Sequence, residues 1–171
     1  MEKQGNLVLI AAVAENGVIG INGEMPWNIR GDLKRFREMT LNHGVVMGRN
    51  TAEHLASRRA FPLDKRLNVI ISTMRDYSGV WNNVISTGSL EFGLEKAMHY
   101  NSDKIGYVIG GGQIYAATIG LPETSRLEIT RVHQTPDGDT CFPEGYQDNF
   151  SLVKTEKHID KGYSFETWTR R

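Results

Sequence analysis

The sequence predicts a single α/β domain, with a mainly parallel central β-sheet flanked by helices and an antiparallel hairpin at its C-terminal edge. Up to about residue 120, short apolar runs alternate with segments of helical periodicity, which is typical of strand–helix–strand units. From residue 127 onward, apolar and polar residues alternate, as they do in antiparallel strands with one face in water. A chain of 171 residues is long enough to bury a core and short enough for one domain, so we expect this domain to span residues 1–171.

The first elements are one strand, one glycine-rich loop and one helix. Residues 7–14 form an apolar run that ends at the turn Asn16-Gly17, and residues 17–24 follow as a loop. This loop is interpreted either as a mobile lid or as a plain hairpin-like connection. Residues 29–39 follow the 3.6-residue period of a helix.

The rest of the chain continues this pattern. Further apolar or alternating runs predict strands at residues 44–47, 67–71, 105–109, 127–132, 151–157 and 163–169. Helices are expected to begin near Arg49, after Ser89 as N-cap, and at Gln113. The parallel part of the sheet is therefore expected before residue 120, and the antiparallel part after it.

Composition argues against several classes of function. The 20 basic and 20 acidic residues balance, so we expect neither a nucleic-acid partner nor a membrane partner. The five histidines have no metal-ligand spacing, and no metal site is predicted. A single cysteine, Cys141, rules out an internal disulfide framework and favours a reducing, cytoplasmic location. The polar N-terminus and the apolar run at residues 7–13 lack the length of a membrane span and the flanks of a secretory signal.

Asp32 has an unusual position for a carboxylate. On a helix, one apolar stripe contains Ile29, Leu33, Phe36 and Met39. Asp32 falls inside this stripe, and burying an ionised carboxylate is costly unless it is paired. It therefore either pairs with a nearby arginine or caps a structural element, or it binds a polar ligand in an apolar cleft with a raised pKa. Helical spacing does not distinguish these alternatives.

Two glycine turns lie between a predicted strand and a predicted helix. Gly48 and Arg49 place a basic side chain at a helix N-terminus, which is either a phosphate site or an ordinary turn with a solvated arginine. Residues 110–112 are three successive glycines, which allow a ligand to approach the backbone closely. Their spacing is not the G-x-G-x-x-G fingerprint of dinucleotide-binding folds.

Taken together and in order, these features resemble the dihydrofolate reductase family over nearly the whole chain. The matching segments are Val18-Ile19-Gly20, Met25-Pro26-Trp27, Asp32 with Phe36 and Thr40, Met47-Gly48-Arg49 with Thr51 and Glu53, Ile109-Gly110-Gly111-Gly112 with Tyr115, and Gly138-Asp139-Thr140 with Phe142-Pro143. The resemblance implies a dihydrofolate reductase-like fold and NADPH-dependent reduction of dihydrofolate to tetrahydrofolate, in support of one-carbon and thymidylate metabolism. It also implies a cis peptide bond between Gly110 and Gly111.

The resemblance implies roles for the substrate-binding positions. Asp32 would hydrogen-bond the pterin ring of the substrate and support its protonation, helped by Thr130 and by a water near Trp27. Arg66 would bind the glutamate carboxylate of the substrate, a task that suits a bidentate guanidinium. The other substrate-binding residues would be Ile10, Ala11, Leu33, Phe36, Leu63, Ile109 and Tyr115.

NADPH would bind along the glycine turns, with residues 110–114 around its pyrophosphate. Its adenosine phosphate end would be surrounded by Arg49, Thr51, Ser72 and Thr73. The further cofactor-binding residues implied are Ala12, Ile19, Gly20, Asn22, Gly23, Met25, Gly48, Asn50, Ile109, Gly110, Gly111, Gly112, Gln113, Ile114, Tyr115 and Thr140. Gln113 stands where members of the family often have a basic residue near the extra phosphate, and Ala52 where many have an aromatic residue. The chemistry of hydride donation belongs to the cofactor, which the protein orients.

Two other functions are alternatives. One is a reductase of the same fold that acts on a pyrimidine intermediate of riboflavin synthesis, and the other is a non-catalytic nucleotide-binding module. Met25-Pro26-Trp27 followed by Asp32 favours dihydrofolate over the pyrimidine, and Asp32 together with residues 110–112 favours an enzyme over a binding module. We expect a monomer whose partners are dihydrofolate and antifolate inhibitors.

Overall fold

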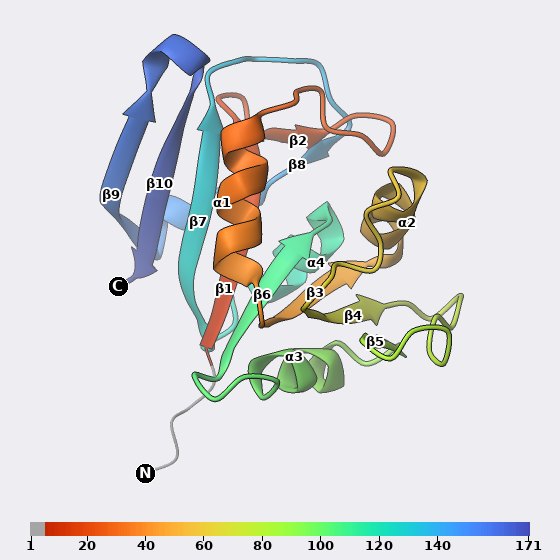
Figure 1. Ribbon diagram of the computed structural model, residues 1–171. Helices are drawn as coiled ribbons and strands as arrows, with labels where there is room; N and C mark the ends of the chain where they lie inside the picture. Colours follow the sequence, from red (N-terminus) through yellow and green to blue (C-terminus); the bar gives the residue numbers. More distant parts are fainter. Residues whose placement is uncertain (1–5) are drawn as a thin grey trace.

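An eight-stranded sheet crosses the molecule, and helices lie on both of its faces (Figure 1). The computed structural model describes residues 6–171, and residues 1–5 of the predicted domain lie outside the described residues. The strand order is β5-β4-β3-β6-β1-β7-β10-β9. These strands are β1 (Asn6–Ala14), β3 (Gly44–Gly48), β4 (Leu67–Ile71), β5 (Val84–Thr87), β6 (Ile105–Gly110), β7 (Thr124–Val132), β9 (Phe150–His158) and β10 (Tyr163–Arg170).

The directions of strand pairing confirm the predicted fold class. β1 pairs in parallel with β6 and β7, β3 pairs in parallel with β4 and β6, and β4 with β5. β10 pairs antiparallel with both β7 and β9, and so forms the predicted C-terminal edge. The chain is therefore a mixed α/β single domain with a mainly parallel sheet.

Each face of the sheet is covered by its own buried apolar cluster. Alternate residues of β1 point to opposite sides, as the two-residue period of a strand requires. The helices are α1 (Arg30–Thr40), α2 (Arg49–Ser57), α3 (Leu90–Met98) and α4 (Gly112–Thr118). Leu7 and Leu9 belong to one cluster, with side chains of α3 and α4, whereas Val8 and Ile10 belong to a second, with side chains of α1 and α2.

β7 obeys the same alternation with polar residues on one side. Leu127 and Ile129 are fully buried in the cluster on the α3 side. Glu128 and Thr130 are 4% and 1% exposed, and their side chains contact α1 on the other side. The first helix therefore has to supply partners for two buried polar groups of the sheet.

The local signals read from the sequence agree with the structure. Ser89 caps α3, because its Oγ accepts a hydrogen bond from the backbone N–H of Phe92 at 3.2 Å. The Gly110–Gly111 peptide bond is cis, as the family resemblance implies, and the Phe61–Pro62 bond is cis as well.

Three features were not predicted from the sequence: the strand β5, a small second sheet and two short 3₁₀ helices. β5 is a four-residue strand at the edge of the sheet, too short to show a period. β2 (Val18–Gly20) and β8 (Thr140–Cys141) pair as a small second sheet, so part of the predicted loop at residues 17–24 is a strand. A Cβ atom on Gly138 would lie 2.3 Å from Cγ1 of Val18, so only glycine allows this approach. Short 3₁₀ helices lie at Tyr146–Asp148 (η1) and Ile159–Lys161 (η2).

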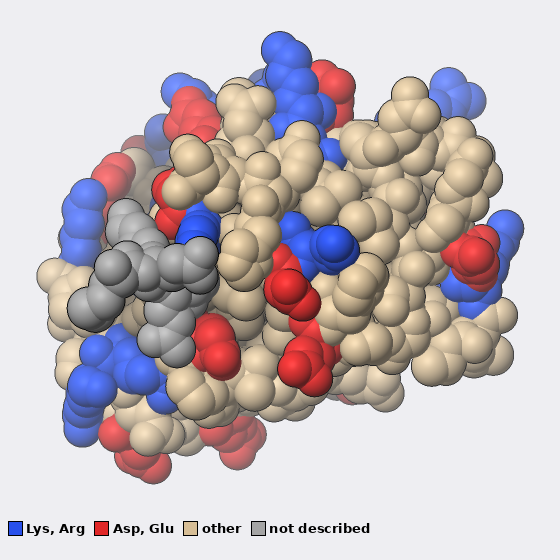
Figure 2. Space-filling view, turned by 90° about the horizontal axis from the view of Figure 1, so that it is seen from below, with Lys and Arg blue, Asp and Glu red and all other residues tan. Residues whose placement is uncertain are grey.

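Charged side chains of both signs are scattered over the face of the molecule seen in Figure 2. Neither sign covers a large continuous area there, which agrees with the equal numbers of acidic and basic residues. Among residues 6–171, no helix is both long enough and apolar enough to span a membrane.

Gly44 allows a close contact between β3 and α3, which gives a test of this packing. A Cβ atom there would lie 2.4 Å from Cα and 2.5 Å from the carbonyl oxygen of Ala97, which are backbone atoms that cannot rotate away. We expect Gly44→Ala to lower the free energy of unfolding by about 1–3 kcal/mol, because the helix or the strand must move. Guanidinium denaturation followed by circular dichroism measures this change.

Gly120→Ala is the matched control, since a Cβ atom at Gly120 has no neighbour within 4 Å. It should change the stability by no more than about 0.5 kcal/mol. Equal effects of the two substitutions would contradict the contact.

Candidate active site

Asp32 lies in the first turn of α1, and its carboxyl contacts β7. Its Oδ1 accepts a hydrogen bond from Oγ1 of Thr130 at 2.6 Å. None of the ion pairs found in residues 6–171 includes Asp32, and the N-cap residue of α1, Ile29, has no side-chain capping bond. Among residues 6–171 no arginine therefore forms an ion pair with Asp32, and the hydrogen-bond partner of its carboxyl is a neutral hydroxyl.

The surroundings of Asp32 raise its pKa above the ordinary value of 3.8. Burial is the largest cause, because it disfavours the ionised form. The hydrogen bond from Thr130 and the positive charge of Arg35 lower the pKa, but by less. A carboxyl in this setting keeps its proton at pH values where an exposed aspartate has lost it.

Apolar and aromatic side chains lie on the same side of the sheet as the contact of Asp32 with Thr130. Ile10 and Leu63 belong to the buried cluster on the α1 side, and Phe36 packs against that cluster. The hydroxyl of Tyr115 donates to the carbonyl oxygen of Ile10 at 2.6 Å. Burial and, to a smaller extent, the negative charge of Asp32 raise the pKa of Tyr115, so its hydroxyl remains a donor.

Trp27 precedes α1, and Leu33 lies in its first turn. The polar atom of Trp27 and the apolar surface of Leu33 are both left without a full set of contacts in the protein. Nε1 of Trp27 is buried and has no hydrogen-bond acceptor within the described part of the chain. Such a donor costs about 1–3 kcal/mol when it stays unpaired. Leu33, expected in the apolar stripe of the helix, is 51% exposed instead. The residues close to Asp32 in the sequence therefore offer a polar donor and an apolar surface.

Arg66, the residue before β4, is only 5% exposed. Its Nε donates to the carbonyl oxygen of Asp64 at 2.8 Å, and its Nη1 donates to Oγ1 of Thr40 at 3.2 Å. Among residues 6–171 no carboxylate forms an ion pair with it, and burial together with nearby Arg37 lowers its pKa. A guanidinium that is fixed by neutral oxygens in this way is suited to bind a carboxylate of a ligand.

The carboxyl ends of three parallel strands bring the two glycine turns together. The strand register pairs Gly48 of β3 with Ile71 of β4, and Met47 of β3 with Gly110 of β6. A Cβ atom on Gly48 would lie 3.8 Å from the backbone nitrogen of Gly111, so the two turns are in close proximity. Ligands of open α/β sheets bind at this kind of edge.

Two helices begin at these turns. The N-cap residues of α2 and α4, Gly48 and Gly111, make no side-chain capping bond, so the first N–H groups of both helices are available to an anion. Arg49 adds a cation at the start of α2, where it forms an ion pair with Glu53 at 3.4 Å. This arrangement fits the phosphates of a nucleotide.

The loop at residues 17–24 is attached to the segment that contains β8. The backbone N–H of Asn22 donates to Oδ2 of Asp139 at 2.8 Å, and Oγ1 of Thr140 donates to Oδ1 of the same carboxylate at 2.9 Å. These two bonds lower the pKa of Asp139. Asn22 and Gly23 both have positive φ, and Met25 is 40% exposed.

The remaining predicted site residues lie on the same elements. They are Ala11 and Ala12 in β1, Ile19 and Gly20 in β2, Asn50 and Thr51 in α2, Ser72 and Thr73 after β4, Ile109 in β6, and Gln113 and Ile114 in α4. The register that pairs Gly48 with Ile71 brings Ser72 to the end of the strand beside the first glycine turn.

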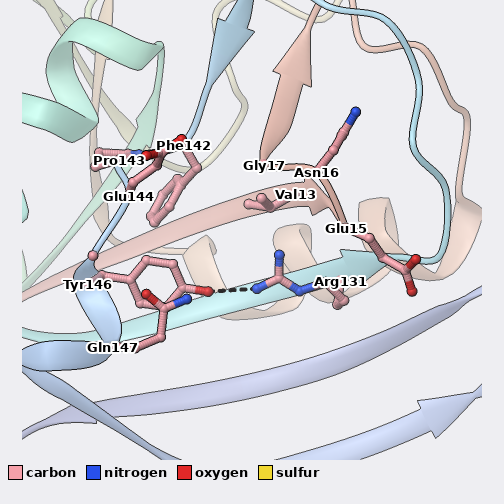
Figure 3. Close-up of a pocket in the computed structure, with 11 residues that line it drawn as sticks. Val13, Glu15, Asn16, Gly17, Arg131, Phe142, Pro143, Glu144, Tyr146 and Gln147 are labelled. Atoms are coloured by element: carbon pink, nitrogen blue, oxygen red, sulfur yellow. Dashed lines mark hydrogen bonds between the residues drawn. The ribbon is translucent and has the colours of Figure 1, made fainter.

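A separate pocket of about 260 Å³ lies on the other face of β7 (Figure 3). Arg131 follows Thr130 in the strand and therefore faces this side. Its guanidinium donates to the hydroxyl of Tyr146 at 2.6 Å and forms an ion pair with Glu166 at 3.3 Å. The pocket contains none of the site residues predicted from the sequence.

Sequence reasoning missed two charged residues that join the elements of the site. Arg35 of α1 and Glu128 of β7 form a buried ion pair beside the contact of Asp32 with Thr130. The available signal was periodicity, because Arg35 lies three residues after Asp32 on a helix and Glu128 lies two residues before Thr130 on a strand.

Comparisons with known proteins agree with this geometry. The sequence model of the family described as "Dihydrofolate reductase" matches residues 6–170. Dihydrofolate reductase HdrB of Haloferax volcanii is 37% identical over 165 residues, which cover 96% of this chain and 83% of that protein. The dihydrofolate reductase of Mycobacterium tuberculosis is 40% identical over 124 residues, which cover 72% of this chain and 70% of that protein.

A solved structure shares the fold as well. The dihydrofolate reductase of Enterococcus faecalis, complexed with NADP(H) and RAB-propyl, superposes with a TM-score of 0.81 at 32% identity and covers 98% of each chain. Because both the sequence and the fold match over almost the whole length, the chain belongs to the dihydrofolate reductase family and is an oxidoreductase.

Proposed function

We propose that this chain transfers a hydride from NADPH to dihydrofolate and so produces tetrahydrofolate. The proposal depends above all on the setting of Asp32. Its carboxyl has a raised pKa, accepts a hydrogen bond from Thr130 and has no ion-pair partner within residues 6–171. Membership of the family supports the reaction, and the solved relative from Enterococcus faecalis was complexed with NADP(H).

Asp32 has the properties required for the protonation half of this reaction. Reduction of a carbon–nitrogen double bond adds a hydride to carbon and a proton to nitrogen. Because burial raises its pKa, Asp32 retains a proton at a pH where an exposed aspartate is ionised. In the proposed mechanism Thr130 orients the carboxyl, and the indole N–H of Trp27 holds a water or a polar ring atom beside it.

The glycine turns fit NADPH by the chemistry of their donors. The uncapped N-termini of α2 and α4 offer N–H groups next to one another, and Arg49 adds positive charge. We assign the phosphates of NADPH to residues 110–114 and to Arg49, Thr51, Ser72 and Thr73. When bound there, the reduced nicotinamide supplies the hydride.

The substrate is assigned to the surface between α1 and the sheet. Ile10, Phe36 and Leu63 provide its apolar wall, and Leu33 covers the outer side. Arg66 binds the glutamate carboxylate, since it is buried and held only by neutral oxygens.

We further propose that one domain spans residues 1–171 and acts as a monomer in the cytoplasm. The single exposed cysteine, Cys141, suits a reducing compartment. Antifolate inhibitors are expected at the substrate site, and neither a nucleic acid nor a membrane is expected as a partner.

The first test follows the absorbance of NADPH when purified protein and dihydrofolate are mixed. We expect oxidation that depends on dihydrofolate and is faster with NADPH than with NADH. Oxidation that requires an aminopyrimidine of the riboflavin pathway instead would favour the related reductase. Tight binding of NADPH without any oxidation would favour a binding module.

Replacing the carboxyl tests its role in turnover. Asp32→Asn keeps an acceptor for the hydroxyl of Thr130 but has no proton to support the reaction, so turnover at pH 7 should fall by about 10²–10⁴-fold. NADPH affinity, measured by fluorescence titration, should stay the same. Asp160→Asn, an exposed aspartate on η2, is the control and should retain full turnover. Near-native turnover of the Asp32 variant would refute the assigned role.

The same variant should be more stable than the parent at neutral pH. Because the pKa of Asp32 is raised in the folded state, the folded protein binds more protons than the unfolded chain above pH 3.8, and its stability falls as the pH rises through this range. The stability of Asp32→Asn does not fall in this way. The difference in the free energy of unfolding between the variant and the parent, measured by urea denaturation, should therefore grow from acid to neutral pH. Asp139→Asn should have the opposite effect, because hydrogen bonds lower the pKa of Asp139.

Arg66 provides a test of substrate orientation. Arg66→Leu should raise KM for dihydrofolate by about 10–100-fold, since a charged hydrogen-bonded contact contributes about 1.5–3 kcal/mol. A reduced pterin substrate without the glutamate should show the same KM with the parent and the variant. An equal rise of KM for both substrates would mean that the substitution disturbs the pterin site instead.

A further inference from the structure

A network of charged side chains connects α1 to β7 beside the candidate active site, with Glu128 buried and Arg35 and Arg126 partly exposed. Glu128 is 4% exposed and accepts hydrogen bonds from Nη2 of Arg35 and from Oγ1 of Thr167, the latter at 2.9 Å. Nε of Arg126 lies 3.0 Å from Oε1 of the same carboxylate. The guanidinium of Arg35 also lies over the ring of Phe165, with Cζ 4.6 Å from the ring centroid. The pair of Arg35 and Glu128 is therefore enclosed on several sides.

This network lies next to the contact of Asp32 with Thr130. Arg35 is three residues after Asp32, which places both on one side of the helix, and Glu128 is two residues before Thr130, which places both on one side of the strand. Two polar contacts one helical turn apart thus join the same two elements. A helix held at two points cannot rotate about its axis without breaking one of them.

We propose that Arg35 and Glu128 are positioning residues for Asp32: their buried ion pair holds its carboxyl against Thr130, and the balance of their charges controls its protonation. The inference rests on the proposed function only in taking Asp32 as the working carboxyl. Arg35 and Glu128 themselves act through Asp32.

The two charges shift the protonation of Asp32 in opposite directions. The positive charge of Arg35 lowers the pKa of Asp32 and so opposes part of the effect of burial. Glu128 offsets this positive charge. Removal of Arg35 should therefore raise the pKa of Asp32, and removal of the charge of Glu128 should lower it, because Arg35 and Arg126 are then less compensated.

Besides the charges of Arg35, Glu128 and Arg126, neutral groups lie near Asp32 on β7 and α4. Thr130 and Tyr115, from β7 and α4, are neutral donors. Tyr163 of β10 lies against Gly31 of α1, since a Cβ atom on that glycine would be 2.2 Å from its hydroxyl. His158 stacks on Tyr163 with ring centroids 4.9 Å apart, and its Nε2 lies 2.9 Å from Oε1 of Glu156 on the outer strand.

The test measures the titration of Asp32 by carbon-13 NMR of its carboxyl, in the absence of substrate. We expect the midpoint to move to higher pH in Arg35→Met and to lower pH in Glu128→Gln. Arg35→Lys keeps the charge, so its midpoint should remain near that of the parent. Because removal of one partner from a buried pair lowers stability in either case, a purely structural role gives no reason for opposite directions.

The ion pair of Arg131 and Glu166 supplies a matched control. It also belongs to β7, and its side chains are 18% and 14% exposed, but it lies on the other face of the sheet. Glu166→Gln should lower stability without moving the midpoint of Asp32. The pH profile of turnover should follow the NMR midpoints, with the loss of rate at high pH displaced upward in Arg35→Met and downward in Glu128→Gln.

Shifts of Asp32 in the same direction in Arg35→Met and Glu128→Gln, or no shift in either, would overturn the inference. If Arg35→Met does not fold, Glu128→Gln decides alone, and a midpoint that is unchanged or higher overturns it. The NMR titration needs no turnover. Opposite shifts in a protein that does not reduce dihydrofolate would therefore refute the proposed function and leave the positioning role intact.

Discussion

Burial on both faces of the parallel strands is the constraint on which this structure depends. β1 and β7 are covered by α1 on one side and by α3 and α4 on the other, so any polar residue that faces a helix needs a partner from that helix. Thr130 and Glu128 find theirs in Asp32 and Arg35. The contacts that satisfy the sheet are thus the same contacts that orient the carboxyl of the site.

Elements with a long pattern were predictable, and short ones were not. β1, β6 and α1 each extend over six or more residues, so an apolar run or a helical period defines them. β5, β2 and β8 have four, three and two residues, and their pairing depends on segments far away in the chain. The pairing of β2 with β8 depends on the close approach of Gly138 to Val18, which no local pattern contains.

In the candidate site, too, some residues could be predicted from the sequence and others could not. Asp32 stood out because a carboxylate in an apolar stripe conflicts with the cost of burial, and the glycine turns stood out by composition. Arg35 and Glu128 did not stand out, because the charge of a residue does not indicate whether its side chain is buried. Arg35 and Glu128 are 93 residues apart in the chain, and their pairing follows from the packing of α1 on β7. The burial of Arg66, which is 5% exposed, likewise depends on tertiary packing. The sequence did not indicate it, because arginine is almost never fully buried unless it is paired.

The small sheet of β2 and β8 joins the loop at residues 17–24 to the segment that contains β8. Its strands have three and two residues, and the same two segments are also joined by hydrogen bonds from the backbone N–H of Asn22 to Asp139 and from Nδ2 of Asn16 to the carbonyl oxygen of Pro136. Its strands pair with each other and with no strand of the eight-stranded sheet, so opening this small sheet breaks no backbone ladder of the central one. The one cysteine of the chain, Cys141, is exposed on β8. A fluorophore attached there would report the motion of this loop from a position outside both buried clusters.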